Sequence, residues 1–136
     1  MTKDDLLKEL HHDTWVMIRP SAIDGIGVFA IRDIPAGTRG LFSRNIGEWI
    51  PVSKEEVSHL PAHARGLIEN YCLFDEENYF IPDYGFKVMD LVNYLNHSDQ
   101  PNLVSIRDGE DFETTRFIQN GEELFIDYGS IVDSKE

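Results

Sequence analysis

Two polar stretches, NHSDQPN at residues 96–102 and GEELFIDYG at residues 121–129, decide how this sequence is interpreted. The first follows an apolar segment whose hydrophobic residues recur at helical spacing from Val88 to Leu95, so we expect a short helix that leads into a polar loop. The second is typical of a strand, and it ends at Tyr128. Taken alone, such a loop is most often a solvated turn and such a tyrosine most often anchors a strand. Neither stretch identifies a site by itself.

A third stretch, GIGVFA at residues 25–30, has the spacing of a dinucleotide-binding glycine fingerprint. That fingerprint requires a helix whose N-terminus faces the pyrophosphate, whereas a β-branched strand and then Pro35 follow here. We therefore exclude a Rossmann-type site. Gly25 and Gly27 have no Cβ and still permit a ligand to approach the backbone closely, although a plain tight turn is the commoner explanation of such a pair.

The chain as a whole is predicted to be α+β and mostly β. Strands are expected over residues 14–19, 28–31, 38–42 and 123–129, and as a pair over 103–118 around the turn Asp108-Gly109. Helices are expected over 4–11, from the capping box of Ser53 and Glu56, and from Pro61, where Ala64, Leu67, Ile68 and Tyr71 are spaced to share one buried face.

Length and composition predict one folded domain, since 136 residues with 41% hydrophobic and 27% charged residues can bury a single core. No apolar run approaches the roughly 18 residues that cross a bilayer, and the N-terminus lacks the features of a signal peptide. We therefore expect an intracellular protein without membrane contact, with cytoplasmic and nuclear locations both open. The formal net charge of −13 repels nucleic acid and attracts cationic partners, although acidity alone most often serves solubility.

The sequence gives little indication of a metal site or of a reactive cysteine. Cys72 is the only cysteine, which excludes an internal disulfide and a thiolate zinc cluster, and we expect it to be a small buried hydrophobic residue. His59 and His63 have the i, i+4 spacing of a ligand pair, but Pro61 interrupts the helix that would align them. We predict no metal site.

In their order along the chain, GIGVFAIRDIPAG at 25–37, NHSDQPN and GEELFIDYG resemble the signatures of the SET-domain protein lysine methyltransferase family. The resemblance covers about Val16 to Tyr128. It implies a knot-like, mostly β fold with a short helical insert, in which the C-terminal segment threads the NHS segment. On this basis we divide the chain into a helical extension at 1–13, a SET domain at 14–129 and a short tail at 130–136.

The same resemblance implies S-adenosylmethionine as the methyl donor, and it implies roles for individual residues. Tyr128 would be the catalytic tyrosine. The residues implied to hold the cofactor are Gly25, Ile26, Gly27, Tyr71, Asn96 and His97, of which Tyr71 is the looser match.

The end of the chain departs from the commoner family pattern. Many members place a cysteine where this sequence has Asp99 and further cysteines after the final tyrosine, where they build a zinc site that closes the lysine channel. Residues 129–136 contain no cysteine. Closure must therefore come from Ile131 and Val132, from a second subunit or from the substrate. Similarity to compact viral SET proteins favours a homodimer.

Two further departures lie close to the implied site. Asn93 replaces an arginine that is common before the NHS segment. Ile126 occupies the position where other members use phenylalanine or tyrosine to set the number of methyl groups added. The degree of methylation therefore stays open, with the aliphatic side chain mildly favouring higher states.

These observations lead us to expect an S-adenosylmethionine-dependent lysine methyltransferase that acts on a basic protein segment, for example a histone tail. The acidic charge fits such a substrate, because it speeds the capture of a peptide rich in lysine and arginine. Two alternatives remain open: a SET domain that has lost activity and serves as a protein-interaction module, and an acidic chaperone-like binder of basic proteins without a cofactor.

Overall fold

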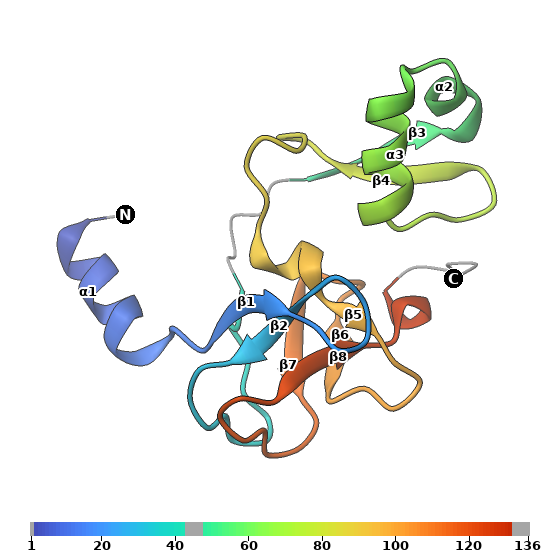
Figure 1. Ribbon diagram of the computed structural model, residues 1–136. Coiled ribbons are helices and arrows are strands. Elements are labelled where there is room, and N and C mark those ends of the chain that lie inside the picture. The colour runs from blue at the N-terminus through green and yellow to red at the C-terminus, as the bar shows by residue number, and fades with distance from the viewer. Residues whose placement is uncertain (1, 43–47, 132–136) are drawn as a thin grey trace.

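The computed structural model describes residues 2–42 and 48–131. Its larger part, which we call the framework, is a mostly β structure that carries the N-terminal and C-terminal segments (Figure 1). One sheet of the framework has the strand order β1-β2-β8-β5. These strands are β1 (Val16–Pro20), β2 (Ile26–Ala30), β5 (Asn96–His97) and β8 (Glu123–Ile126). A second sheet pairs β6 (Leu103–Ile106) with β7 (Asp111–Thr114).

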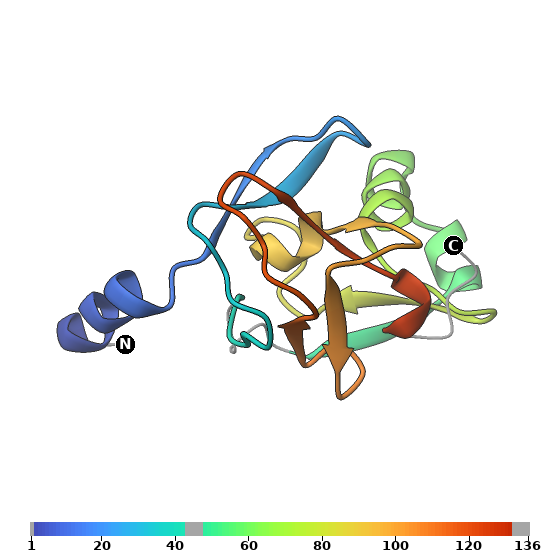
Figure 2. The ribbon, with the colours of Figure 1, turned by 90° about the horizontal axis from the view of Figure 1, so that it is seen from below.

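The position of β8 defines the topology of the framework. It pairs antiparallel with β2 on one side and parallel with β5 on the other, where Asn96 is opposite Phe125 and His97 is opposite Ile126. The last strand of the chain thus lies between strands from its beginning and its middle, as expected for a C-terminal segment that threads the NHS segment. Figure 2 shows β6 and β7 on the side of β8 opposite the β1-β2 hairpin.

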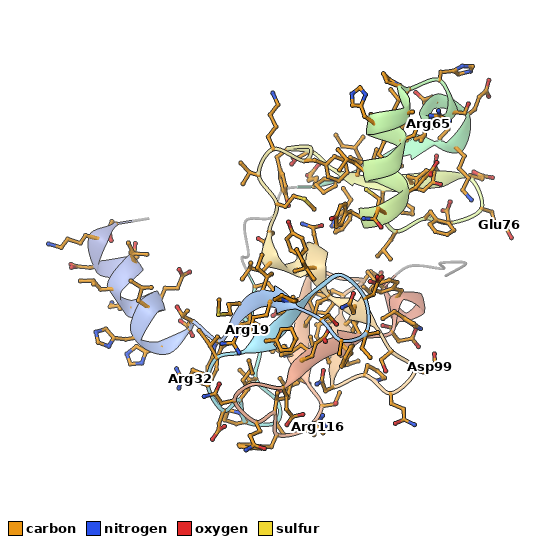
Figure 3. The ribbon with its side chains drawn as sticks, in the orientation of Figure 1. Arg19, Arg32, Arg65, Glu76, Asp99 and Arg116 are labelled. Atoms are coloured by element: carbon orange, nitrogen blue, oxygen red, sulfur yellow. The ribbon has the colours of Figure 1, made fainter. Side chains whose placement is uncertain are left out.

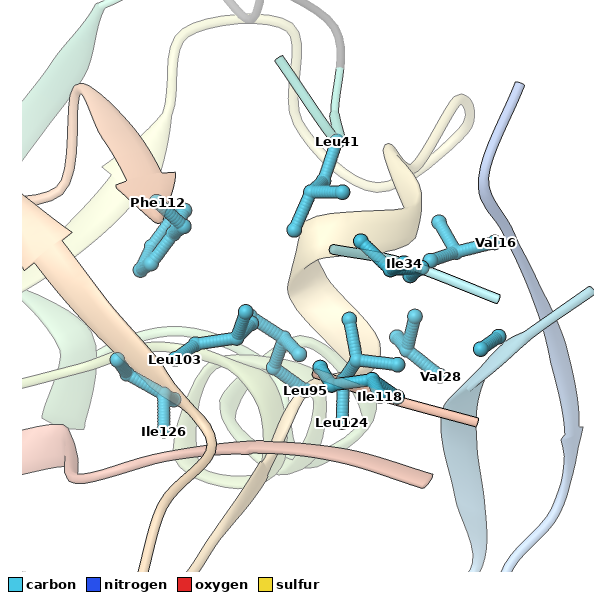
Figure 4. Packing of buried hydrophobic residues seen from close by; sticks show 11 residues of the cluster. Val16, Val28, Ile34, Leu41, Leu95, Leu103, Phe112, Ile118, Leu124 and Ile126 are labelled. Carbon is cyan, nitrogen blue, oxygen red and sulfur yellow. The ribbon is translucent and has the colours of Figure 1, made fainter. Parts of the chain in front are cut away.

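The framework encloses the main hydrophobic core (Figure 4). Leu124 and Ile126 alternate along β8 and are at most 1% exposed, as expected for the inward face of a strand with period two. They pack in one cluster with Val28 of β2. Ile34 and Ile118, which form an isolated bridge between two loops, are fully buried in the same cluster. The core therefore ties β8 to segments nearly one hundred residues away.

A buried asparagine extends the pairing along β8. Asn102 is only 2% exposed, and its side chain binds two backbone groups of this strand. Its oxygen accepts the N–H of Phe125 at 2.8 Å, and its amide nitrogen donates to the carbonyl of Glu123 at 2.9 Å. Backbone groups left unpaired in a protein interior lower the stability of the fold. The Asn102 side chain provides the hydrogen bonds that a neighbouring strand would otherwise make to β8.

The smaller part of the molecule, which we call the insert, lies between β2 and β5 in the sequence (Figure 1). Its antiparallel hairpin pairs β3 (Trp49–Ser53) with β4 (Asn78–Pro82), and it carries the helices α2 (Lys54–Ser58) and α3 (Ala62–Tyr71). The predicted capping box of Ser53 and Glu56 begins α2. A small separate core is made by Val57, Ile68 and Cys72.

The helix α1 (Lys3–His12) extends away from the framework in both views of the molecule (Figures 1 and 2). A capping box of Thr2 and Asp5 begins it, and none of its residues is buried. Among the described residues, no helix is long and apolar enough to cross a membrane.

Four details of the sequence prediction are wrong. Residues 38–42 form no strand, because Gly40 adopts φ +70° and only the backbone around Thr38 pairs with β7. The hairpin of β3 and β4 was not predicted. Leu67 is 40% exposed, so α3 buries a narrower face than its spacing indicates. The helix expected from Val88 is reduced to the 3-10 helix η1 (Leu91–Tyr94), because the side chain of Asp90 caps the chain there.

Candidate functional site

Asn96 connects β5 to the turn that precedes β2. Its side-chain nitrogen donates to a carboxylate oxygen of Glu123 at 2.8 Å and lies 3.2 Å and 3.4 Å from the carbonyl oxygens of Asp24 and Ile26. These acceptors fix the orientation of the amide, because a carbonyl oxygen cannot donate to them. The side-chain oxygen of Asn96 makes no hydrogen bond within the described part of the chain. It remains available to accept one from a ligand.

Glu123 is a site residue that the sequence analysis missed. Its carboxylate accepts the hydroxyl of Ser21 at 2.7 Å with one oxygen and the Asn96 amide with the other. A Cβ added at Gly27 would collide with this carboxylate, so only glycine leaves room for the pair. The signal was the second acid of GEELFIDYG, a charged residue at the first position of a strand that otherwise enters the core.

Gly25 serves the same turn in a different way. Its φ is +47°, a left-handed conformation that favours glycine, and a Cβ added there would meet no atom within 4 Å. The turn is closed by the N–H of Ser21, which donates to the carbonyl of Gly25 at 2.9 Å. The structure therefore brings Gly25, Ile26, Gly27 and Asn96 together, with open space beside Gly25.

Tyr128 begins the 3-10 helix η2 (Tyr128–Ser130) directly after β8. Its phenol donates a hydrogen bond of 2.6 Å to the carbonyl of Leu95, the residue that immediately precedes Asn96. Its ring centroid lies 5.2 Å from that of His97. Leu95 and His97 therefore both contact Tyr128, and the two motifs form one structural unit.

His97 holds the backbone of Tyr128 in place. The Tyr128 N–H donates to Nδ1 of His97 at 3.1 Å, so this nitrogen carries no proton. The ring proton then lies on Nε2, which is 3.2 Å from a carboxylate oxygen of Asp99. Asp127 comes within 3.8 Å of Nδ1, but this contact is no ion pair because Nδ1 is already an acceptor. His97 thus links β5 to η2 through the backbone of Tyr128.

A cavity opens between the framework and the insert, with an empty volume of about 630 Å³ including its mouth. Its framework wall contains Leu95, Ile126 and Tyr128, and its insert wall contains Tyr71 and Cys72. Tyr71 and Tyr128 therefore share one cavity, whereas Gly25, Ile26, Gly27 and Asn96 form a cluster outside its lining. Residues 95–97 connect the cavity to this cluster, because Leu95 lines the cavity and Asn96 belongs to the cluster.

Tyr71 is thus placed in the cavity wall, not beside the turn of Gly25. Its ring packs edge-on against Tyr94 of η1, with centroids 6.0 Å apart. The neighbouring Cys72 is 4% exposed, as predicted, and burial raises the pKa of its thiol to about 12. At neutral pH Cys72 is therefore a protonated wall residue and not a nucleophile.

The residues that depart from the family pattern are also placed by the structure. Ile126 is 1% exposed in the cavity wall, and Asn93 lines the cavity while its side chain donates to the carbonyl of Asp90. Ile131 is part of the same wall, whereas Val132 lies outside the described residues. Asp99 is on an exposed loop (Figure 3).

Two further properties describe the surroundings of the site. Within residues 2–42 and 48–131, no group of three or more histidine, cysteine, aspartate or glutamate side chains could hold a metal ion. The labelled basic residues Arg19, Arg32 and Arg116 lie on the framework side of the molecule, and Arg65 lies on the insert (Figure 3). None of these four arginines lines the cavity.

Comparisons with known proteins found one family model and several solved structures of similar fold. A family model described as SET domain matches residues 25–129. Two mutant structures of the Chaetomium thermophilum Polycomb repressive complex 2, one in the apo form and one bound to an inhibitor, align at 24% and 21% identity with TM-scores of 0.58 and 0.55. Each alignment covers 93% of this chain but only 18% and 17% of the other, so these likenesses concern the fold alone.

A smaller solved protein also aligns along most of its length. It is a Plasmodium falciparum protein described as a candidate histone methyltransferase, with 21% identity and a TM-score of 0.49. The alignment covers 86% of this chain and 95% of that one. No curated protein sequence matches the chain.

Proposed function

The chain belongs to the SET-domain family, and from this premise we propose that it is a protein-lysine N-methyltransferase that uses S-adenosylmethionine and acts on a basic protein segment. The observation that carries the proposal is the placement of the Tyr128 hydroxyl. It lies 2.6 Å from the Leu95 carbonyl oxygen, and both residues line the cavity. Two oxygen atoms at the wall of such a cavity suit a reaction in which a positively polarised methyl group is transferred.

The cavity wall also suits the substrate amine. A free lysine has a pKa of about 10.4, so it is mostly protonated at neutral pH and cannot attack as a nucleophile. Walls built from residues such as Leu95, Ile126 and Ile131 disfavour the charged ammonium, which lowers the pKa of the entering amine. Because methyl transfer is an in-line displacement, alignment of the amine matters more than a strong acid or base.

The residues around Gly25 and Asn96 fit the proposed cofactor. S-adenosylmethionine, when bound, supplies the methyl group from its sulfonium centre. Its ammonium group needs acceptors, and the free side-chain oxygen of Asn96 is one. Gly25, which has open space beside its Cα, permits close approach to the backbone. Glu123 fixes both the turn and the Asn96 amide, so the acceptor is held ready before the ligand binds.

The charge of the chain supports a basic substrate. With 25 acidic against 12 basic side chains, the protein attracts segments rich in lysine and arginine, of which a histone tail is one example. Ile131 already contributes to the cavity wall, which favours closure of the lysine channel by the chain itself. The homodimer, the intracellular location and the number of methyl groups stay predictions.

The proposal is tested by incubating the full chain with methyl-labelled S-adenosylmethionine and a panel of basic proteins that includes histones. We expect label on lysine side chains, seen as mass increments of methyl groups in tryptic peptides. Calorimetry with the cofactor separates the alternatives. An interaction module would bind basic proteins without binding S-adenosylmethionine, and a chaperone-like binder would keep its histone affinity in Asn96→Ala. The proposal would be refuted if no methyl transfer occurred and either the chain bound basic proteins without binding S-adenosylmethionine or Asn96→Ala kept its histone affinity.

A further inference from the structure

No apolar side chain of the helix α1 packs on either hydrophobic core of the described chain. Leu6, Leu7 and Leu10 are 43%, 45% and 57% exposed. In a helix, Leu10 lies about one turn beyond both of the other leucines, so the three side chains share one face. α1 thus presents an apolar stripe that the rest of the described residues leave uncovered.

The link between α1 and the framework holds the helix away from the rest of the molecule. Only three residues separate α1 from β1. The N–H of Asp13 and the hydroxyl of Thr14 both donate to the carbonyl of Glu9, at 2.8 Å and 3.0 Å. The carbonyl of Trp15 accepts the N–H of Ile31 of the framework at 2.9 Å. α1 therefore cannot fold back onto the framework while these hydrogen bonds hold, and both views show it extended (Figures 1 and 2).

Two charges at the ends of α1 are placed against the helix dipole. Lys3 lies three residues before Leu6, and Asp13 lies three residues after Leu10, so both continue the apolar stripe. A cation is unfavourable at a helix N-terminus, and an anion is unfavourable at a C-terminus. Neither side chain makes an ion pair within residues 2–42 and 48–131. These two charges therefore weaken a helix that, at ten residues, is already marginal in water on its own.

A second copy of α1, packed antiparallel on the first, compensates both charges. When Leu6 of one copy faces Leu10 of the other, Lys3 faces Asp13 of the second copy. The two-fold axis makes this ion pair twice. Each lysine then lies near the C-terminus of the neighbouring helix and each aspartate near its N-terminus, where the dipole favours them. In a parallel pair, by contrast, Lys3 would face Lys3 and Asp13 would face Asp13.

We propose that α1 is a dimerisation surface, on which α1 of a second copy of this chain packs antiparallel. The surface is independent of methyl transfer, and α1 and the insert lie on opposite sides of the framework (Figure 1). The cavity therefore stays open in both copies. Two ten-residue helices bury less area than a standard protein interface, and Glu9 of the two copies would approach each other. We therefore expect a weak dimer, with a Kd of about 100 μM.

Sedimentation velocity of the full chain tests the proposal. Between about 10 μM and about 1 mM we expect the mean mass to rise from 15.6 kDa towards twice that value. Leu6→Ser combined with Leu10→Ser removes most of the apolar stripe and should keep the chain monomeric throughout. Leu67→Ser, at a leucine of α3 that is 40% exposed, is the matched control and should dimerise like the wild type. The melting temperature shows whether each variant folds.

Charge reversal tests the antiparallel orientation. Lys3→Glu should raise the Kd about ten-fold, because it converts two attractive pairs into two repulsive ones, and Asp13→Lys should do the same. The two changes together restore opposite charges and should return the Kd to the wild-type value or below it. A parallel pair would respond little to any of these variants. Glu9→Gln removes the like-charged contact beside the two-fold axis and should lower the Kd about two-fold.

The dimerisation surface would be overturned by a monomer at every concentration, or by a dimer that survives the two serine substitutions. It would also be overturned if the combined reversal failed to recover the affinity that each single reversal loses. None of these variants changes a residue that lines the cavity or lies in the cluster around Gly25. Methyl transfer by the monomeric variant therefore tests the proposed function separately.

Discussion

The framework and the insert hold their residues in place by different means. In the framework, side chains from segments far apart in the sequence bind one another, as Asn102 does with β8 and Asn96 with Glu123. The insert is a hairpin with two short helices, closed over a small core that includes Val57 and Ile68. The framework holds Asn96 and Tyr128, whereas the insert supplies one wall of the cavity. Substitutions in the two parts should therefore have different consequences.

The largest effect is expected at Asn102. Asn102→Ala removes two hydrogen bonds and leaves two backbone groups of β8 unpaired, so we expect a loss of about 3 kcal/mol in the free energy of unfolding. Urea denaturation at neutral pH measures it. Gln100→Ala, on the exposed part of the same loop, should change stability by less than about 0.5 kcal/mol. Equal effects of the two changes would show that the side chain does not hold β8.

Two glycine substitutions should have opposite signs. Gly27→Ala places a methyl group against the Glu123 carboxylate and should destabilise the framework by about 2 kcal/mol. Gly66→Ala, in the middle of α3 and with open space around it, should stabilise the insert by about 0.5–1 kcal/mol, because alanine favours helix. Thermal denaturation of both variants tests the contrast, and a stabilising Gly27→Ala would contradict the packing described for the site.

Glu123 should affect the cofactor more than the fold. Glu123→Ala releases Ser21 and the Asn96 amide, and we expect affinity for S-adenosylmethionine to fall about ten-fold, or 1.4 kcal/mol. Glu123→Gln can still bond both partners and should recover most of the affinity. Calorimetry gives both values. Glu69→Ala, an exposed acid of the insert, serves as the charge control and should bind the cofactor normally.

The smallest effect is a pH dependence within the insert. Hydrogen bonds from the backbone N–H groups of Asn78 and Glu77 lower the pKa of Asp75 below its unfolded value. The stability that they contribute is therefore present above the unfolded pKa of about 3.9 and is lost as the pH falls through the folded pKa. Asp75→Asn keeps the acceptor but does not titrate, so its melting temperature should fall less between pH 5 and pH 2. An identical acid slope in both proteins would exclude this contribution.

The sequence predicted the framework better than the insert, for a physical reason. The apolar run of β8 and the turn at Asp108-Gly109 are local signals. The family resemblance depends only on the order in which GIGVFA, NHSDQPN and GEELFIDYG follow one another along the chain. The hairpin of the insert was missed because its strand β3 contains Pro51 and lies half exposed, which hides the strand pattern. Leu67 has the spacing of the buried face of α3 but is exposed, so helical spacing does not show how much of a helix face is covered by the rest of the protein.

Some residues of the candidate site could be identified from the sequence and others could not. Gly25, Gly27 and Asn96 could be singled out from the sequence because each lies in a stretch with a recognisable motif, and the structure places them close together. Glu123 was missed because its role depends on a contact with Ser21, which lies 102 positions away and leaves no trace in local sequence. Tyr71 lies in the cavity wall, and its role in holding the cofactor stays a prediction.

The central claim is that Tyr128 and the Leu95 carbonyl define the point of methyl transfer. Tyr128→Phe removes only the hydroxyl of the 2.6 Å hydrogen bond and keeps the ring. The decisive measurement is the initial rate of labelled methyl transfer from S-adenosylmethionine to lysine by the wild type and by this variant, with cofactor affinity determined in parallel. We predict a fall in rate of about a hundred-fold with a cofactor Kd within about two-fold of the wild type. An unchanged rate in Tyr128→Phe would contradict the account.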